Sequence, residues 1–225
     1  FIIKILHRDS LQRGGFAGLK EHRLVTDSSI FGAHKDSGAW DGLGNFVYLA
    51  DASFMPHGQT NMHDHREIDV ISVMMSGRIQ HAGSLEDGQM MESHHAQVQR
   101  AGGEGFSHNE INPDDTENRM IQLWVKPQVA NQKADYKLYE PKEGMTRIYG
   151  GSSEQDETFD NSTVMEVGVL QAGADIAHGG KFMAYITKGA GLLSGVSVKE
   201  GDLIRDNNLM FIATEDSELI LIYEN

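Results

Sequence analysis

Histidines concentrate in one stretch of the chain, and their spacing points to metal chemistry. Seven of the 11 histidines lie between residues 57 and 108, namely His57, His63, His65, His81, His94, His95 and His108. His63 and His65 are separated by one residue, and a run typical of a β-strand follows them. Residues i and i+2 of a strand project from the same face, so these two imidazoles can bind one ion.

A second pair with the same spacing stands further along the chain, where His108 and Glu110 flank Asn109. If this strand lies beside the first, three imidazoles and one carboxylate surround a common centre. Such a set suits Fe(II), Mn(II), Ni(II), Cu(II) or Zn(II), and contains too much nitrogen for calcium or magnesium. It also leaves coordination positions open, which catalysis at a metal requires.

Less specific interpretations exist for each of these residues. A single H-x-H segment is more often a pair of surface histidines than a metal site, but two such pairs beside strands favour the metal. Glu110, the one carboxylate of the expected set, is the candidate proton acceptor. His81 is expected to lie one short hairpin from these ligands. It either orients substrate or a water molecule near the metal, or it faces solvent as an ordinary hairpin histidine.

Short apolar runs, rather than helical periodicity, dominate the chain. They occur at residues 46–49, 70–75, 120–125 and 219–223, and glycine, asparagine and aspartate clusters separate them. Many short strands with turn residues between them indicate a β-sandwich or barrel, so we predict an all-β fold. Residues 189–195 nearly match a dinucleotide-binding fingerprint but lack its strand–helix context, and we interpret them as a hairpin.

A polar segment that holds two of the four prolines, Pro127 and Pro141, separates two sets of strand-like runs. We expect an N-terminal metal-binding domain at residues 1–127, a linker or arm at 128–144, and a C-terminal domain at 145–225. A segment near the N-terminus is expected to contribute strands to the C-terminal domain. That domain has one histidine after the linker, His178, so we expect it to be degenerate and to lack the metal site.

Composition narrows the class of function. The net charge of −14 argues against direct nucleic-acid binding, because phosphate contacts require clustered lysine and arginine. No apolar run approaches the roughly 20 residues of a membrane helix, so we expect no membrane partner. The chain has no cysteine, which excludes disulfides, thiolate ligands and a cysteine nucleophile, and a cytoplasmic location is expected.

The motifs resemble those of the pirin family in the cupin superfamily, and of its shorter bacterial members in particular. The resembling segments are the glycine followed by the two histidines at residues 58–65, the Gly77–His81 stretch, the glycine-rich segment 101–110 and the Q-L-W-V-K-P sequence at 122–127. Specificity is concentrated between residues 58 and 127. Looser similarity extends along most of the chain.

The resemblance implies a bicupin, in which two β-barrel or jelly-roll cupin domains are packed together. It implies that His63, His65, His108 and Glu110 bind one divalent transition metal, with Fe(II) expected first and Mn, Ni, Cu or Zn as alternatives. The implied activity is quercetin 2,3-dioxygenase-like oxidation of a flavonol or related aromatic diol, with Glu110 and His81 as candidate catalytic residues. The alternative is a non-catalytic, metal-dependent regulator or transcription cofactor that acts through a protein partner.

Three departures from the pirin pattern surround the expected site. Asp69 stands where a glutamate usually follows the second histidine by four residues, and Asn109 replaces a serine. Gly83 stands where the turn after the first hairpin usually carries an acidic residue. Because these positions flank the ligands, the identity of the substrate is the property they affect most.

Overall fold

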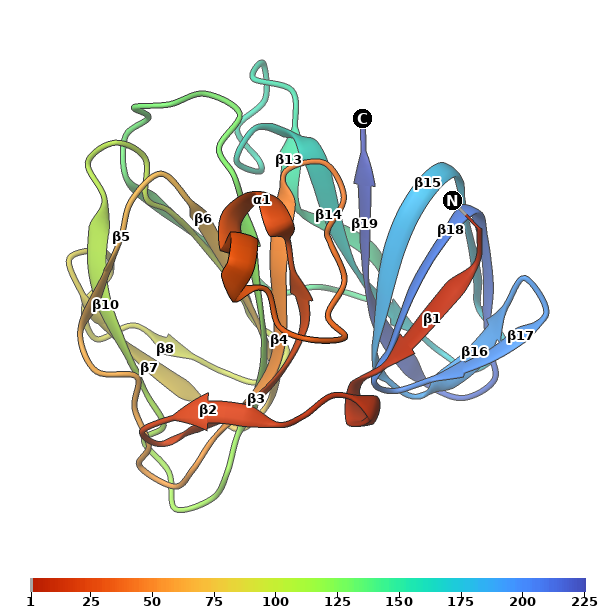
Figure 1. The fold of residues 1–225 in the computed structure, drawn as a ribbon, viewed down its shortest axis with the longest axis horizontal. Coiled ribbons are helices and arrows are strands. Elements are labelled where there is room, and N and C mark those ends of the chain that lie inside the picture. The colour runs from red at the N-terminus through yellow and green to blue at the C-terminus, as the bar shows by residue number, and fades with distance from the viewer. Residues whose placement is uncertain (1) are drawn as a thin grey trace. The chain divides into compact units, whose positions relative to one another are not determined.

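The computed structural model describes residues 2–225, and Figure 1 shows a chain built almost entirely of strands. The chain divides into two compact units. The N-terminal unit comprises Leu11–Glu140, and the C-terminal unit comprises Pro141–Asn225 together with the described residues up to Ser10. The predicted all-β class is confirmed. No helix in the described residues is long and apolar enough to cross a membrane.

The N-terminal unit consists of two antiparallel sheets. One has seven strands in the order β12-β9-β6-β11-β4-β3-β2, and the other has four in the order β5-β10-β7-β8. The elements are β2 (Gly14–Phe16), β3 (Leu19–Thr26), α1 (Ser28–Phe31), η2 (Gly32–His34), β4 (Phe46–Phe54), β5 (His63–His65), β6 (Asp69–Ser76), β7 (Ile79–Gly83), β8 (Met90–Met91), β9 (Ala96–Arg100), β10 (Phe106–Ile111), β11 (Arg119–Val125) and β12 (Asp135–Tyr139).

Alternation along the strands separates a cavity-facing set of residues from an outward set. In β4 and β11 the residues on one face are Tyr48, Ala50, Ala52 and Phe54, and Met120, Gln122 and Trp124, all of which line one cavity. Side chains alternate between the two faces of a strand, so these residues share a face. The cavity therefore lies against the seven-stranded sheet.

A short helical segment closes one part of this unit. Asp27 caps α1 by accepting a hydrogen bond from the backbone N–H of Ser29, and α1 ends at Phe31. The Phe31 ring stacks on the rings of Tyr48 and Trp124, at centroid distances of 5.9 and 6.2 Å. Tyr48 and Trp124 are partners on adjacent strands and stack at 4.2 Å, so three aromatic rings support one end of the cavity wall.

The C-terminal unit contains one eight-stranded sheet, ordered β13-β14-β19-β15-β18-β16-β17, with β1 paired to β18. Its elements are β1 (Lys4–His7), η1 (Arg8–Ser10), β13 (Gly144–Gly151), β14 (Asn161–Leu170), β15 (Asp175–Lys188), β16 (Ala190–Leu193), β17 (Val196–Lys199), β18 (Asp202–Ala213) and β19 (Ser217–Glu224). Buried Phe182, Ile204, Phe211 and Leu219 belong to its core. The hairpin predicted at residues 189–195 is confirmed: these residues contain β16 and the turn that leads into its antiparallel partner β17.

A buried ion pair joins two strands of the N-terminal unit. Asp69 of β6 stands directly opposite Arg100 of β9, and an Arg100 Nη2 donates to an Asp69 carboxylate oxygen at 2.9 Å. The two side chains are 1% and 5% exposed. Asp69 therefore neutralises a buried guanidinium, and the glutamate-to-aspartate departure noted in the sequence concerns this ion pair.

We predict that Arg100→Met destabilises the protein by about 3–5 kcal/mol, because it leaves the Asp69 carboxylate buried without its cation. The double substitution Asp69→Leu/Arg100→Met should recover most of that loss. Urea unfolding monitored by circular dichroism measures both. Lys20→Met, which breaks the exposed Lys20–Glu117 pair, is the control and should cost less than about 1 kcal/mol. Equal losses for Arg100→Met and Lys20→Met would contradict the prediction.

Candidate metal centre

Strands β5 and β10 bring the two histidine-containing segments side by side. They pair antiparallel, with His108 opposite His63 and Phe106 opposite His65. In β10 the buried residues alternate with less buried ones, so Phe106, His108 and Glu110 face the interior. The sequence-based expectation that the second strand lies beside the first is met.

The three imidazoles converge on one point. The Nε2 atom of His108 lies 2.7 Å from Nε2 of His63 and 3.2 Å from Nε2 of His65. One ring nitrogen from each histidine lies within 4.8 Å of the others, and among the described residues these three form the group with metal-ligand spacing. The rings meet edge to face, which lets each direct a nitrogen toward the centre.

Hydrogen bonds behind His108 determine which of its nitrogens carries the proton. Nδ1 of His81 faces the backbone carbonyl of Glu86 at 3.1 Å and must donate to it. In the neutral ring Nε2 of His81 is then an acceptor, so the Gln99 amide donates to it at 2.7 Å. The Gln99 carbonyl oxygen consequently faces Nδ1 of His108 at 3.1 Å, and that nitrogen must be the donor. His108 therefore presents a lone pair on Nε2.

His63 is oriented in the same way from the other side. Its Nδ1 lies 2.8 Å from the backbone carbonyl of Asn61 and donates to it, so Nε2 of the neutral ring also carries a lone pair. Two lone pairs 2.7 Å apart repel each other unless a cation lies beside them. A metal ion with nitrogen ligands at about 2.0–2.1 Å separates neighbouring nitrogens by roughly 2.9–3.4 Å, close to the observed spacing.

Protonation of the His65 and His108 rings is disfavoured. Burial lowers the pKa of His108 to about 2, and the neighbouring histidines lower it further. Burial likewise lowers the pKa of His65 to about 4, with an electrostatic contribution from the neighbouring His63 as a second cause. Both rings are therefore neutral at physiological pH, as metal ligation requires. The donor set fits a transition-metal ion.

Glu110 stands beside this group with its carboxylate incompletely paired. Its Oε1 lies 3.6 Å from Nε2 of His108 and accepts a hydrogen bond from the Gln122 amide at 3.1 Å. Its Oε2 is buried and has no hydrogen-bond partner among residues 2–225. Burial raises the pKa of Glu110 to about 7. A buried carboxylate oxygen without a partner is costly, and a bound cation would remove that cost.

The structure contradicts one of the two interpretations given for His81 from the sequence. It stands opposite Glu110 on β7 and is fully buried, so the solvent-facing alternative is wrong. It does not line the cavity beside the imidazoles either. Gln99 bridges His81 to Nδ1 of His108, the ring nitrogen that points away from the candidate metal position.

Gly83 has a structural reason for departing from the family pattern. It lies opposite His108 with φ at 150°, and a Cβ built there would stand 2.1 Å from the Ser107 carbonyl oxygen. Any larger residue would push β7 away from β10. Glycine at this position therefore allows the close strand approach on which the orientation of His108 depends.

The cavity in front of the imidazoles lies between the two sheets and has a volume of about 260 Å³. The four-stranded sheet with the preceding loop provides Thr60, His63, His65 and Glu110, and the seven-stranded sheet provides mostly apolar side chains together with Glu21, Arg23 and Gln122. Sequence reasoning missed Glu21, Arg23 and Gln99. Their only sequence signal is a polar residue at an inward position of a strand, which becomes visible once the faces of the strands are known.

Comparison with known proteins agrees with the motifs. Residues 33–125 match the family model described as Pirin. A protein of Zymomonas mobilis is 24% identical over 76% of this chain and 79% of its own length, and one of Pseudomonas aeruginosa is 29% identical over 71% and 75%. Both carry the name "Putative quercetin 2,3-dioxygenase".

Solved structures share the fold over nearly the whole chain. The bacterial pirin YhhW of Escherichia coli, in complex with nickel(II), aligns with a TM-score of 0.84 at 16% identity and covers 98% of both chains. A quercetin 2,3-dioxygenase of Acinetobacter baumannii aligns at 0.74 and 16% identity, over 99% of this chain and 85% of its own. The resemblance seen in the motifs is confirmed: residues 33–125 match the pirin family model, and the fold of a bacterial pirin is shared over 98% of the chain.

Proposed function

We propose that His63, His65, His108 and Glu110 bind one divalent transition metal, Fe(II) in the first place, and that the chain catalyses quercetin 2,3-dioxygenase-like oxidation of a flavonol or related aromatic diol. The observation that carries the proposal is the pair of opposed lone pairs on His63 and His108, 2.7 Å apart. The names of the relatives and the nickel(II) complex of a structural neighbour support it.

The metal, when bound, supplies Lewis-acid polarisation and a place where a phenolate and dioxygen meet. The chain's own residues do the rest. Glu110 lines the cavity, and its carboxylate would accept the phenol proton when it is not bound to the cation. Tyr48 and Trp124 provide an aromatic wall against which a flat ring lies, and the apolar lining excludes water from the reacting atoms.

Gln99 and His81 act as positioning residues. Gln99 accepts from His108 and donates to His81, and this fixes the His108 ring with its Nε2 lone pair toward the centre. Groups that orient a ligand in this way commonly contribute a factor of about 10–100 to metal affinity. The two residues therefore support metal binding without touching the substrate.

We predict that His63→Ala or His108→Ala lowers Ni(II) affinity by more than about 100-fold, because each removes one of three imidazole ligands. Calorimetric titration measures the affinity, and circular dichroism checks the fold. His57→Ala is the matched control, since His57 is exposed and contacts Asp115 instead of the imidazole group. Affinity that is unchanged in His108→Ala would exclude this site.

We predict that Ni(II) affinity falls about tenfold per pH unit below about pH 7 and is level above it. The raised pKa of Glu110 means that its carboxyl must lose a proton before it binds a cation, whereas His65 and His108 are already neutral in this range. Titrations between pH 5.5 and 8 measure the slope. Glu110→Gln should flatten it between pH 5.5 and 7, and an unchanged slope in that variant would count against ligation by Glu110.

We expect Fe(II)-loaded protein to consume oxygen with quercetin faster than free Fe(II) does. An oxygen electrode records the rate, and product analysis establishes ring opening. Glu110→Gln should reduce the rate by about 100-fold or more if Glu110 accepts the proton. Uptake no faster than that of free Fe(II) would exclude the dioxygenase activity while leaving metal binding intact.

A further inference from the structure

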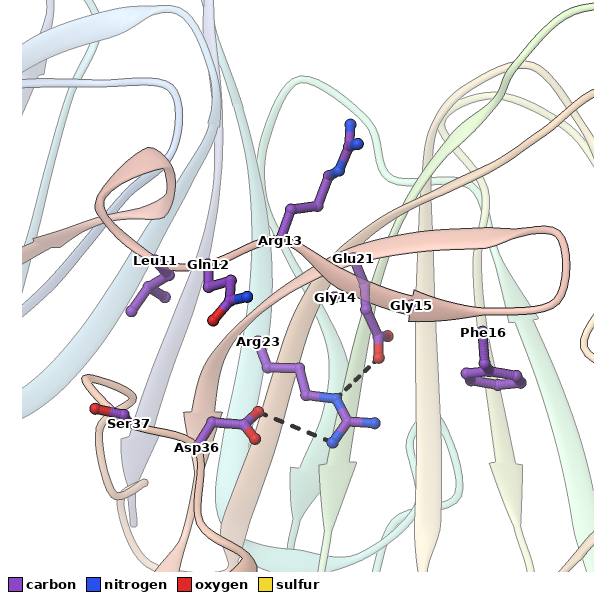
Figure 2. Close-up of a pocket in the computed structure, with 10 residues that line it drawn as sticks. All are labelled: Leu11, Gln12, Arg13, Gly14, Gly15, Phe16, Glu21, Arg23, Asp36 and Ser37. Carbon is purple, nitrogen blue, oxygen red and sulfur yellow. Dashed lines mark hydrogen bonds and ion pairs between the residues drawn. The ribbon is translucent and has the colours of Figure 1, made fainter.

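The cavity at the imidazoles has a neighbour with which it shares part of its lining. This second pocket, called here the outer pocket, has a volume of about 320 Å³ and is lined by Leu11, Gln12, Arg13, Gly14, Gly15, Phe16, Glu21, Arg23, Asp36 and Ser37 (Figure 2). Phe16, Glu21 and Arg23 also line the cavity at the imidazoles, called here the inner cavity. The two hollows therefore meet at these three side chains.

The inner cavity is mainly apolar on the side of the seven-stranded sheet. Leu19, Phe54 and Met120 contribute aliphatic and aromatic surface. The side chains of Ala50 and Ala52 are small, and the cavity occupies the volume that larger side chains would fill. Ala52 stands between Glu21 on β3 and Met120 on β11 in the strand register. Its methyl group is therefore part of the floor on which a ligand would lie.

The outer pocket is polar and its charges balance. Its lining contains two arginines, Arg13 and Arg23, and two carboxylates, Glu21 and Asp36. Figure 2 shows the Arg23 guanidinium between them: its Nε donates to Glu21 at 2.8 Å, and its Nη1 lies 3.9 Å from Asp36. Such a pocket offers donors and acceptors without a net charge, which matches an uncharged group with several hydroxyls.

The proposed metal binding does not account for the buried carboxylate of Glu21. It is 6% exposed, lies at the junction of the two hollows, and receives its hydrogen bonds from Arg23 and, at 3.4 Å, from the Tyr48 hydroxyl. A carboxylate has about four acceptor positions, so Glu21 can accept further hydrogen bonds from a ligand hydroxyl. Buried polar groups of this kind commonly determine ligand orientation and specificity.

The order of the strands determines how long a ligand must be to reach from Glu21 to the Gln122–Glu110 pair beside the imidazoles. Glu21 lies on β3 and Gln122, which contacts Glu110, lies on β11, with β4 between the two strands. Neighbouring strands are about 4.8 Å apart, so the two ends are roughly 10 Å apart across the sheet. An aromatic system of two or three rings spans that distance.

We propose that the outer pocket is a second binding subsite, which takes an uncharged, polyhydroxylated substituent of an aromatic ligand whose ring system lies in the inner cavity. The preferred ligand is thus an aromatic glycoside or a similarly hydroxylated conjugate rather than the bare aromatic compound. This inference rests on the proposed function for the place of the ring system. Its test measures binding alone and needs no turnover.

Gly14 offers a way to fill the outer pocket without touching the inner cavity. It stands directly opposite Glu21 in the β2–β3 pairing, and opposite residues project to the same side of a sheet. A Cβ built at Gly14 meets no atom within 4 Å, and its φ is not in the left-handed region. The bulky side chain of Gly14→Phe should therefore enter the outer pocket beside Glu21.

The experiment is equilibrium dialysis of the full chain loaded with Zn(II), which has no redox chemistry, against quercetin and its 7-O- and 4′-O-glucosides. We expect at least one glucoside to bind about tenfold more tightly than quercetin. Gly14→Phe should abolish that preference and leave quercetin binding unchanged. Ser37→Trp, at another residue of the outer pocket, serves as a second blocking variant if Gly14→Phe does not fold.

Two further variants complete the test. Ala52→Leu fills the inner cavity and should weaken quercetin and glucoside alike, whereas Gly179→Phe, also at a glycine with open space around it, should change neither. Glucosides that bind no more tightly than quercetin, or a preference that survives both blocking variants, would overturn the inference. A preserved preference in wild type combined with no oxygen uptake would count against the proposed function alone.

Discussion

The candidate metal centre depends on one electrostatic constraint, the convergence of imidazole nitrogens from β5 and β10. Nε2 of His63 and Nε2 of His108 are both acceptors by the hydrogen bonds behind them, and they lie 2.7 Å apart. Burial disfavours the charged form of the His108 ring. A bound cation would offset the repulsion between these two lone pairs.

Contacts between the two sheets maintain that arrangement. His108 on β10 of the four-stranded sheet bonds to Gln99 on β9 of the seven-stranded sheet, and Glu110 bonds to Gln122 on β11. Each candidate ligand on β10 is therefore fixed from across the interior as well as along its own strand. Since both contacts are buried, loss of either would leave an unpaired polar group, and this opposes separation of the sheets at the centre.

The sequence predicts the part of this site that is local. The i, i+2 spacing of His63 with His65, and of His108 with Glu110, requires only that each segment be a strand, and its alternation then fixes the facing side. The burial of His81 and the role of Gln99 depend on which strand lies beside which, and that information is not local. The same holds for the inner cavity, because the space above Ala50 and Ala52 exists only when β3, β4 and β11 are adjacent.

The candidate metal ligands and the residues that shape the cavity lie on different sheets. The candidate ligands lie on β5 and β10, whereas the floor of the inner cavity and the polar junction at Glu21 and Arg23 lie on β3, β4 and β11. A substitution such as one at Ala52 changes the space for a ligand without altering the hydrogen bonds that orient His108. Residues that line the floor of the cavity can therefore vary while the imidazole geometry stays constant, so the space for a ligand and the orientation of the candidate ligands are set independently within one fold.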